Sequence, residues 1–213
     1  MEIGKRFDKV AKEYDTPDKL ERSQKVVEFL KHNLPVSKKW KVLDFGCGTG
    51  TTALLLSPFV NSITGVDLSK GMLEVFQERI KNFGIENIKI ENKDILNEEF
   101  LEKDFDLIIT AMTFHHLENP QKAVEKLGSY LKNNGYLAIM DLEKEDGTFH
   151  SDNTDVKHFG FDREEIENWF NNSNFKVIKI ETVYEIQKER DGKTRKYPVF
   201  IAIGKKNQGA VID

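Results

Sequence analysis

An acidic residue and three glycines at alternate positions form the first candidate site in this chain. Asp44 is followed by Gly46, Gly48 and Gly50, and an apolar run leads into the acidic residue. Glycine allows the backbone to turn sharply, and it lets a ligand approach with no side chain in the way. In proteins that alternate strands and helices, such a turn follows a strand and receives part of a nucleoside. The pattern therefore predicts a nucleoside-binding turn.

A second carboxylate follows at a distance that suits a ribose. Asp67 ends the next apolar run, residues 63–66, and lies 17 positions after Gly50. A carboxylate at the tip of the neighbouring strand can accept hydrogen bonds from both ribose hydroxyls. The dinucleotide fingerprint G-x-G-x-x-G would place its third glycine at position 51, where this chain has Thr51. The register of the glycines therefore favours a nucleoside other than NAD.

The segment from Asp44 to Gly50 resembles motif I of the class I S-adenosylmethionine (SAM) methyltransferases, (D/E)-x-G-x-G-x-G, at all four fixed positions. Residues 112–120, 141–150 and 158–165 are similar to segments of small-molecule methyltransferases related to ubiquinone and menaquinone biosynthesis. The resemblance implies SAM as the cofactor, S-adenosylhomocysteine (SAH) as the product, and methyl transfer to O, S or N of a small-molecule acceptor. A SAM-binding sensor or partner subunit without catalysis stays open as an alternative, as does an NAD-dependent oxidoreductase.

The same resemblance implies a role for each residue around the cofactor. Asp44 would hold the methionyl amino group, Asp67 the ribose diol, and Asp94 the adenine amino group, while Leu68 and Met72 would pack against adenine. The cofactor-binding residues that the resemblance implies are Tyr14, Asp44, Gly46, Cys47, Gly48, Gly50, Asp67, Leu68, Met72, Asp94, Ile95 and Thr110.

Plainer interpretations stay open for three of these residues. Met72 suits an ordinary core position, Tyr14 suits simple helix packing, and Cys47 suits a crowded turn that needs a small side chain. After the predicted fourth strand, the chain lacks the (N/D)-P-P-(Y/F) tetrapeptide that nucleic-acid and glutamine N-methyltransferases of the family often carry. That difference disfavours methylation of nucleobase or glutamine amino groups.

Four of the five histidines fall in two segments that we expect at the acceptor side of the pocket. His115 and His116 follow the predicted fourth strand, and His150 and His158 lie in the loop after the fifth. Imidazole titrates near neutral pH, so it suits the deprotonation of a thiol, phenol or hydroxyl acceptor. We therefore take these four histidines as the candidate catalytic residues.

Two other interpretations of the histidines stay open. They could cap turns and pack locally, or they could bind a metal ion together with an acidic neighbour. The acidic residues considered for such a site are Asp141, Glu143 and Asp152. The sequence alone assigns no metal ligand.

The elements that must position these residues alternate along the chain. Strands are expected at 41–45, 63–66, 88–90, 105–109, 136–140, 176–186 and 197–203, with helices after the first, second, fourth and fifth strands and a turn at Asp191-Gly192. Alternation predicts an α/β fold with a parallel sheet covered on both faces. The resemblance implies a Rossmann-like, doubly wound, seven-stranded sheet of order 3-2-1-4-5-7-6 with the last strand antiparallel. The expected division is a helical N-terminal lid at 1–36, a methyltransferase domain at 37–206, and a tail at 207–213.

Local signals define several of these elements. One helical face is expected to carry Leu20, Val27, Leu30 and Leu34. Ser69 is expected to cap a helix that carries Met72, Leu73, Phe76, Ile80 and Phe83 on one stripe. Asn134-Gly135 is expected to turn the chain into the fifth strand, and Asp162 with Glu165 to form a capping box.

Composition limits the class of protein. The chain has 213 residues, a formal net charge of −4 and one cysteine, Cys47, so no internal disulfide is possible. No apolar run approaches the roughly 18 residues of a membrane span, and the first residues lack the apolar core of a secretory signal. We therefore expect a cytoplasmic monomer or homodimer that acts on a small molecule rather than on nucleic acid, which would favour a basic face.

Overall fold

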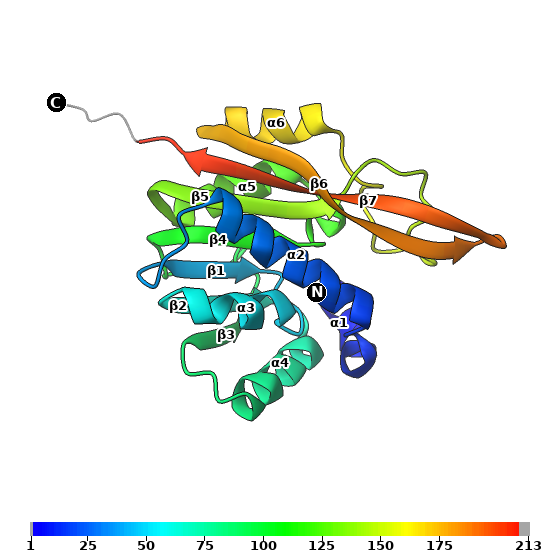
Figure 1. Ribbon diagram of the computed structural model, residues 1–213, viewed down its shortest axis with the longest axis horizontal. Helices are drawn as coiled ribbons and strands as arrows, with labels where there is room; N and C mark the ends of the chain where they lie inside the picture. The colour runs from blue at the N-terminus through cyan, green and yellow to red at the C-terminus, as the bar shows by residue number, and fades with distance from the viewer. Residues whose placement is uncertain (1, 209–213) are drawn as a thin grey trace. The chain divides into compact units, whose positions relative to one another are not determined.

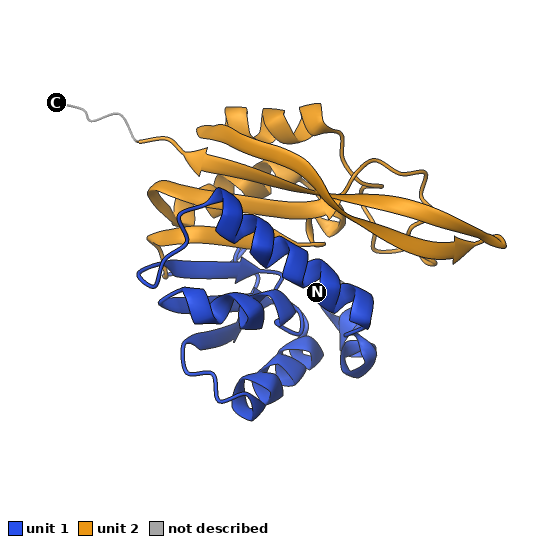
Figure 2. Cartoon of the chain, in the orientation of Figure 1, with its two compact units in different colours: residues 1–101 blue, residues 102–213 orange. Residues whose placement is uncertain are grey.

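The structure is a computed structural model that describes residues 2–208. Of the expected tail at 207–213, residues 209–213 lie outside the described part of the chain. The strand order is β3-β2-β1-β4-β5-β7-β6, the order implied by the resemblance (Figure 1). The chain divides into two compact units, residues 1–101 and residues 102–213 (Figure 2).

The first unit contains the three strands that precede residue 101. These are β1 (Lys41–Phe45), β2 (Ser62–Asp67) and β3 (Ile88–Asn92). β2 pairs in parallel with both β1 and β3. β1 and β2 bury nearly all of their residues, as expected of strands in a parallel sheet with both faces covered.

In the described part of the first unit, residues 2–101, there are also six helical segments. Their bounds are α1 (Glu2–Asp8), η1 (Ala11–Glu13), α2 (Pro17–Asn33), α3 (Thr51–Leu56), η2 (Ser57–Phe59) and α4 (Lys70–Asn82). Thr16 caps α2 by accepting a hydrogen bond from the backbone N–H of Lys19, with Pro17 in the first turn. Ser69 caps α4 in the same way, as predicted, by accepting from the backbone N–H of Met72.

Two residues of the predicted apolar helix faces are exposed. Leu20 is 44% exposed, because it lies in the first turn of α2, whereas the buried residues of this helix begin at Ser23. Phe83 is 65% exposed, because α4 ends at Asn82 and Phe83 is the C-cap. In both places the apolar stripe extends beyond the part of the helix that has a packing partner.

The second unit contains a parallel pair of strands and an antiparallel hairpin. β4 (Phe105–Ala111) pairs in parallel with β5 (Leu131–Leu142). β7 (Lys193–Lys206) pairs antiparallel with both β5 and β6 (Phe175–Arg190). The helical segments of this unit are η3 (Phe114–His116), α5 (Pro120–Tyr130) and α6 (Arg163–Asn172). The predicted capping box of Asp162 and Glu165 begins α6.

The strands of this unit are longer than the sequence suggested. β5 begins at Leu131, so Asn134-Gly135 lies inside it, where Asn134 has a φ of 64° and the β4–β5 register shifts between Phe105 and Leu107. β6 and β7 extend almost to the tight turn at Asp191 and Gly192, whose φ values are 52° and 71°. Consecutive positive φ values suit the two-residue hairpin turn that the sequence predicted.

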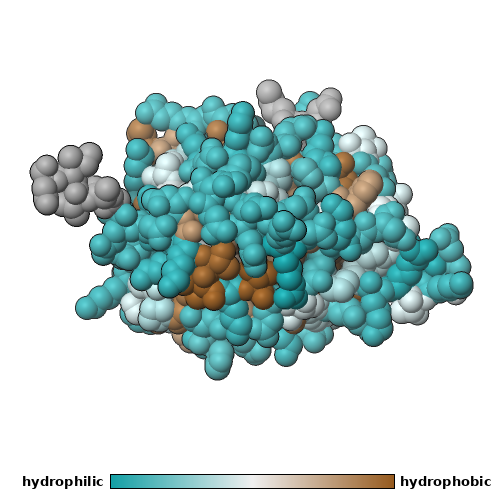
Figure 3. All heavy atoms as spheres, turned by 90° about the horizontal axis from the view of Figure 1, so that it is seen from above, coloured by the Kyte–Doolittle hydropathy of each residue, from teal (hydrophilic) through white to brown (hydrophobic). Residues whose placement is uncertain are grey.

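The surface drawn in Figure 3 is mostly hydrophilic, with an apolar patch near its centre. Within residues 2–208, no helix has both the length and the apolar character needed to cross a membrane.

Candidate active site

The glycine turn of the first unit is built around three residues in the left-handed region. Gly46, Gly48 and Gly50 have φ values of 71°, 53° and 78°. The backbone N–H groups of Gly46 and Cys47 donate to the carbonyl of Val66 at 2.9 and 3.1 Å, which ties the turn to β2. Because side chains are strained at such φ values, glycine is required here by the backbone alone.

Gly48 and Gly50 meet different surroundings. A Cβ on Gly50 would lie 2.1 Å from the ring of Phe76, so this glycine allows the turn to pack against α4. A Cβ on Gly48 would meet no described atom within 4 Å. The structure therefore leaves space directly at the middle glycine, where a ligand can approach the backbone.

Asp67 connects this turn to the end of β2. Its Oδ2 accepts the backbone N–H of Gly48 at 2.8 Å, and its Oδ1 accepts that of Ser69 at 2.8 Å. Burial raises the pKa of Asp67, although these N–H donors oppose the rise. A carboxylate accepts up to about four hydrogen bonds. Asp67 therefore keeps acceptor capacity for ribose hydroxyls while it shapes the turn.

Asp44 is a buried carboxyl whose hydrogen bonding is incomplete. It is 2% exposed, and its Oδ2 has no hydrogen-bond partner among residues 2–208. Burial, with the negative charge of Asp67, raises its pKa to about 7. A buried acceptor without a partner costs about 1–3 kcal/mol. A cationic donor such as an ammonium group would supply the missing hydrogen bond.

The N-terminal segment reaches the glycine turn through Asp15. One carboxylate oxygen accepts the hydroxyls of Thr49 and Thr51 at 2.8 and 3.0 Å. The other accepts Nη1 of Arg79 at 2.9 Å, and the same nitrogen donates to the carbonyl of Thr49 at 3.0 Å. A single carboxylate thus links the N-terminal segment, the turn and α4.

Asp8 makes a second link to the cofactor side of this unit. Its Oδ1 accepts the hydroxyl of Ser69 at 2.6 Å and the backbone N–H of Gly71 at 2.8 Å, and these bonds lower its pKa. Tyr14 follows on the same segment and is half-buried. Burial raises the pKa of the Tyr14 hydroxyl. The positive charge of Arg22 lowers this pKa, and the negative charge of Asp67 raises it further. Tyr14 therefore lies within the electric field of Asp67.

The other predicted cofactor residues of this unit lie in mixed surroundings. Met72 is 2% exposed and Ile95 is fully buried, whereas Leu68 is 38% exposed. Cys47 is buried, and burial raises the pKa of its thiol, as do Asp44 and Asp67. Asp94 accepts the backbone N–H groups of Leu96 and Asn97, so it caps its own turn.

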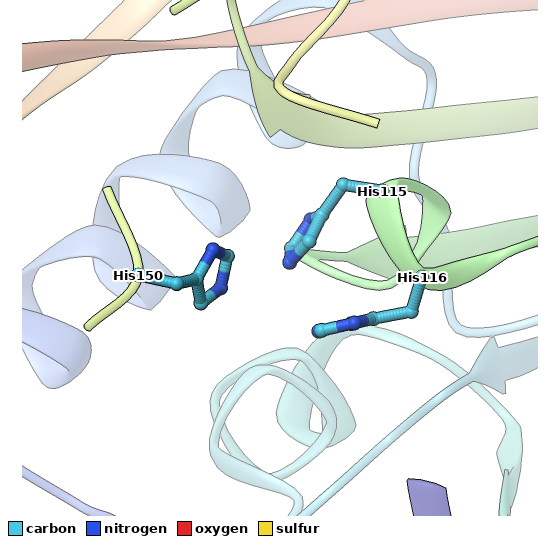
Figure 4. A group of neighbouring side chains, drawn as sticks. All are labelled: His115, His116 and His150. Atoms are coloured by element: carbon cyan, nitrogen blue, oxygen red, sulfur yellow. The ribbon is translucent and has the colours of Figure 1, made fainter. Parts of the chain in front are cut away.

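In the second unit, three of the four predicted histidines gather into one cluster (Figure 4). His115 and His116 come from η3, and His150 faces them from the loop after β5. One ring nitrogen of each lies within 4.8 Å of the others. The ring centroid of His115 lies 4.1 Å from that of His116 and 5.0 Å from that of His150. We call these three residues the histidine cluster.

His115 is fixed by Asp141 at the end of β5. Its Nδ1 lies 2.7 Å from Oδ1 of Asp141, and its backbone N–H donates to Oδ2 at 3.2 Å. His115 is 1% exposed, and its Nε2 is buried with no hydrogen-bond partner among the described residues. Burial alone would raise the pKa of Asp141, but the charge and hydrogen bonds of His115, with the N–H of Leu142, lower it.

His158 and Thr110 are placed differently from the cluster. Nε2 of His158 lies 3.0 Å from the carbonyl of Leu117, and its ring packs against Phe161 at 5.2 Å between centroids. These contacts hold the loop after β5 onto the segment after η3. Thr110, near the end of β4, is buried, and its Oγ1 has no hydrogen-bond partner within residues 2–208.

Sequence reasoning missed three carboxylates that organise these sites. Asp8 ends α1 and Asp15 lies in the short connection between η1 and α2, and no local pattern shows that they bind Ser69 or Thr49. Asp141 was considered only as a metal ligand, although it directly follows an apolar strand, as do Asp44 and Asp67. That signal could have identified it as a buried functional carboxylate.

Fold and turn together define a class of Rossmann-like proteins that bind a nucleoside at the carboxyl ends of parallel strands. The family model described as "Methyltransferase domain" matches residues 36–200 of this chain. The chain belongs to this methyltransferase family.

Relatives and solved structures agree with that assignment. An uncharacterized methyltransferase of Schizosaccharomyces pombe is 30% identical over 80% of this chain and 77% of its own length. A demethylmenaquinone methyltransferase of Bacteroides fragilis is 29% identical over 68% of this chain, which spans 62% of that relative. A SAM-dependent methyltransferase structure from Aquifex aeolicus has a TM-score of 0.71 at 23% identity, over 93% of this chain and 97% of that one.

The protein is therefore a SAM-dependent methyltransferase. The residues present fit the cofactor. Asp44 offers a buried acceptor oxygen without a partner to the amino group of SAM, and Gly48 offers space beside a bare backbone. A cationic amino acid joined to a nucleoside can use both features.

Proposed function

We propose that this methyltransferase transfers the methyl group of SAM to O, S or N of a small molecule. The observation that carries this proposal is the histidine cluster beside Asp141, in a protein of this family. A net charge of −4 supports a small molecule over nucleic acid as the acceptor. The single buried cysteine is compatible with a cytoplasmic protein. A monomer or homodimer remains our expectation.

On the cofactor side, we propose that residues 1–36 form a lid that helps to hold SAM. Asp67 accepts the ribose hydroxyls, Asp44 accepts the amino group, and the backbone at Gly46, Gly48 and Gly50 lies along the amino-acid part. The links from Asp8 and Asp15 to Ser69 and Thr49 support the role of the lid. Tyr14, Cys47, Leu68, Met72, Asp94, Ile95 and Thr110 complete the proposed lining, with Met72 and Cys47 acting through packing.

On the acceptor side, the bound cofactor supplies an activated methyl group, so the chain must position the acceptor and assist loss of its proton. We assign that task to the histidine cluster. Asp141 holds the ring of His115 through Nδ1, which directs Nε2 toward the other two rings. His158, which holds the loop through Leu117, is assigned a positioning role.

The test is SAH release across a panel of thiols, phenols, amines and carboxylates, followed by variants on the acceptor that reacts. His150→Ala and His115→Ala are expected to lower turnover by about 100-fold or more, the scale of general acid–base assistance. SAH affinity, measured by calorimetry, should change less than about threefold. Asp67→Asn is the matched contrast, because it should weaken SAH by about tenfold or more through a lost charged hydrogen bond.

Equal losses of turnover and SAH affinity in the histidine variants would contradict a role on the acceptor side. Tight SAH binding with no turnover on any acceptor would favour the sensor alternative.

A further inference from the structure

The histidine cluster has more imidazoles than proton transfer alone requires. A general base uses one ring, yet three rings from two segments face a common space (Figure 4). The centroids of His116 and His150 are 5.7 Å apart, and all three candidate nitrogens lie within 4.8 Å of one another. Three imidazoles at this spacing form a recognised ligand set for a divalent transition metal.

The hydrogen bonds of the cluster favour the correct tautomer for such a site. Nδ1 of His115 bonds to Asp141, and Nδ1 of His116 lies 2.8 Å from the carbonyl of Asp155. A carbonyl or carboxylate can only accept, so Nδ1 donates in both cases and the neutral ring carries its lone pair on Nε2. Metal-binding histidines almost always donate their second nitrogen in this way to a carboxylate or carbonyl.

The buried nitrogen of His115 supplies independent support. Nε2 is buried with no hydrogen-bond partner within residues 2–208, in a side chain that is almost fully enclosed. A buried polar nitrogen without a hydrogen-bond partner is unfavourable, so a ligand that binds this nitrogen would be stabilising. The nitrogen faces the rings of His116 and His150, as Figure 4 shows, so a partner placed there would contact all three.

We propose that His115, His116 and His150 bind a divalent transition metal ion and leave one coordination position for the methyl acceptor. Imidazole nitrogens suit Zn²⁺ and similar ions rather than Mg²⁺ or Ca²⁺, which prefer oxygen. Zinc–nitrogen bonds of about 2.0–2.1 Å would require the rings to approach by roughly 1 Å. His116 and His150 are only half-buried, so small side-chain rotations can supply this movement.

The role of the open position rests on the proposed function, whereas the ion site does not. An acceptor thiol that binds the ion loses its proton to water, because a bound cation stabilises the thiolate. The sulfur lone pair then forms the bond to the methyl carbon, and the electrons of the broken C–S bond remain on the cofactor as SAH. Three protein ligands and one open position are typical of catalytic zinc, and thiolate is a favoured ligand, so a thiol is the expected acceptor class.

The test uses the full chain without a histidine tag, after removal of metal by a chelator. Titration with Zn²⁺ by calorimetry, and with Co²⁺ by visible absorption, should show one equivalent bound. His150→Ala and His116→Ala should weaken binding by at least about 100-fold, and Asp141→Asn by about 10- to 100-fold. His32→Ala, an exposed histidine on α2, is the matched control and should leave binding unchanged.

SAH titration of each variant separates this inference from folding and from the proposed function. Retained SAH affinity with lost Zn²⁺ binding in His150→Ala supports the metal site. Absence of stoichiometric binding, or equal weakening in His32→Ala, would overturn it. If thiol turnover persists in wild-type protein freed of metal, the acceptor does not bind the ion, so the role given to the open position is wrong and the proposed function stands. If metal binds but no acceptor is methylated, the proposed function fails instead.

Discussion

Asp44 and Asp67 show how two carboxylates in one unit acquire different tasks. Asp67 is satisfied by two backbone N–H groups, so it shapes the turn before any ligand arrives. Asp44 is more deeply enclosed, has an oxygen without a partner among the described residues, and experiences the charge of Asp67. Its ionisation is therefore unfavourable until a cation approaches. A ligand with a positive charge would therefore stabilise the ionised Asp44 carboxylate best.

At the residue scale, we expect SAH affinity to depend on pH through Asp44. Its pKa of about 7 means that the carboxyl is mostly protonated at pH 6 and mostly ionised at pH 8. The ammonium group of SAH requires the ionised form, so affinity should rise by about tenfold between pH 6 and pH 8. Calorimetric titration in Asp44→Asn should show weaker binding without this rise. An unchanged pH profile in the variant would exclude Asp44 as its source.

In the ligand-free protein, Asp44 should give the free energy of unfolding a pH dependence opposite to that of SAH affinity. Because burial raises the pKa of Asp44, the folded state keeps a proton that the unfolded state releases near pH 3.8. The contribution of Asp44 to the free energy of unfolding is therefore full below about pH 4 and is lost as pH rises toward 7. Denaturant unfolding at several pH values should show this decline, and Asp44→Asn should reduce its slope.

At the scale of elements, two glycines of the same turn are needed for different reasons, one for folding and the other for ligand binding. Gly50 packs against Phe76 of α4, whereas Gly48 borders space. Both have positive φ values, so both carry the same kind of backbone strain when substituted. The difference between them therefore isolates the effect of a side chain on the ligand.

We expect Gly50→Ala and Gly48→Ala to have contrasting effects. Gly50→Ala should lower the free energy of unfolding by more than about 2 kcal/mol, because its Cβ would overlap the Phe76 ring. Gly48→Ala should cost only about 1 kcal/mol in stability but weaken SAH by at least about tenfold. Denaturant unfolding and calorimetry measure the two effects. Normal SAH affinity in Gly48→Ala would show that the ligand does not approach this backbone.

The elements themselves could mostly be predicted, and the errors have local causes. Ser69, Asp162 and Glu165 cap their helices as the sequence suggests, because a cap depends on residues a few positions apart. Leu20 and Phe83 belong to the predicted apolar faces but are exposed, because periodicity shows which face a residue occupies but not where its packing partner ends. β5 begins before Asn134, since pairing with β4 extends a strand past a turn signal.

At the scale of the whole molecule, we expect SAH to stabilise the protein against heat. SAH at 100 times its dissociation constant should add about 2.7 kcal/mol to the free energy of unfolding. For a protein of this size that raises Tm by roughly 5–10 °C. Differential scanning fluorimetry measures the shift, and Asp67→Asn should reduce it. NADH should produce no shift, because the glycine register does not match the dinucleotide fingerprint. A larger shift with NADH than with SAH would contradict SAH as the ligand of the glycine turn.

The sequence by itself determined the family and the cofactor turn, and the resemblance to that family implied the strand order. The turn depends on residues close together in the chain, where glycine spacing, apolar runs and caps act through local geometry. Tertiary structure alone decided which polar groups meet. His150 joins His115 and His116 from a separate loop, Asp141 holds His115 across 26 positions, and Asp15 reaches Arg79 across 64. Such contacts depend on how the strands and loops fold back on one another. The spacing of residues along the chain does not predict which distant residues come into contact.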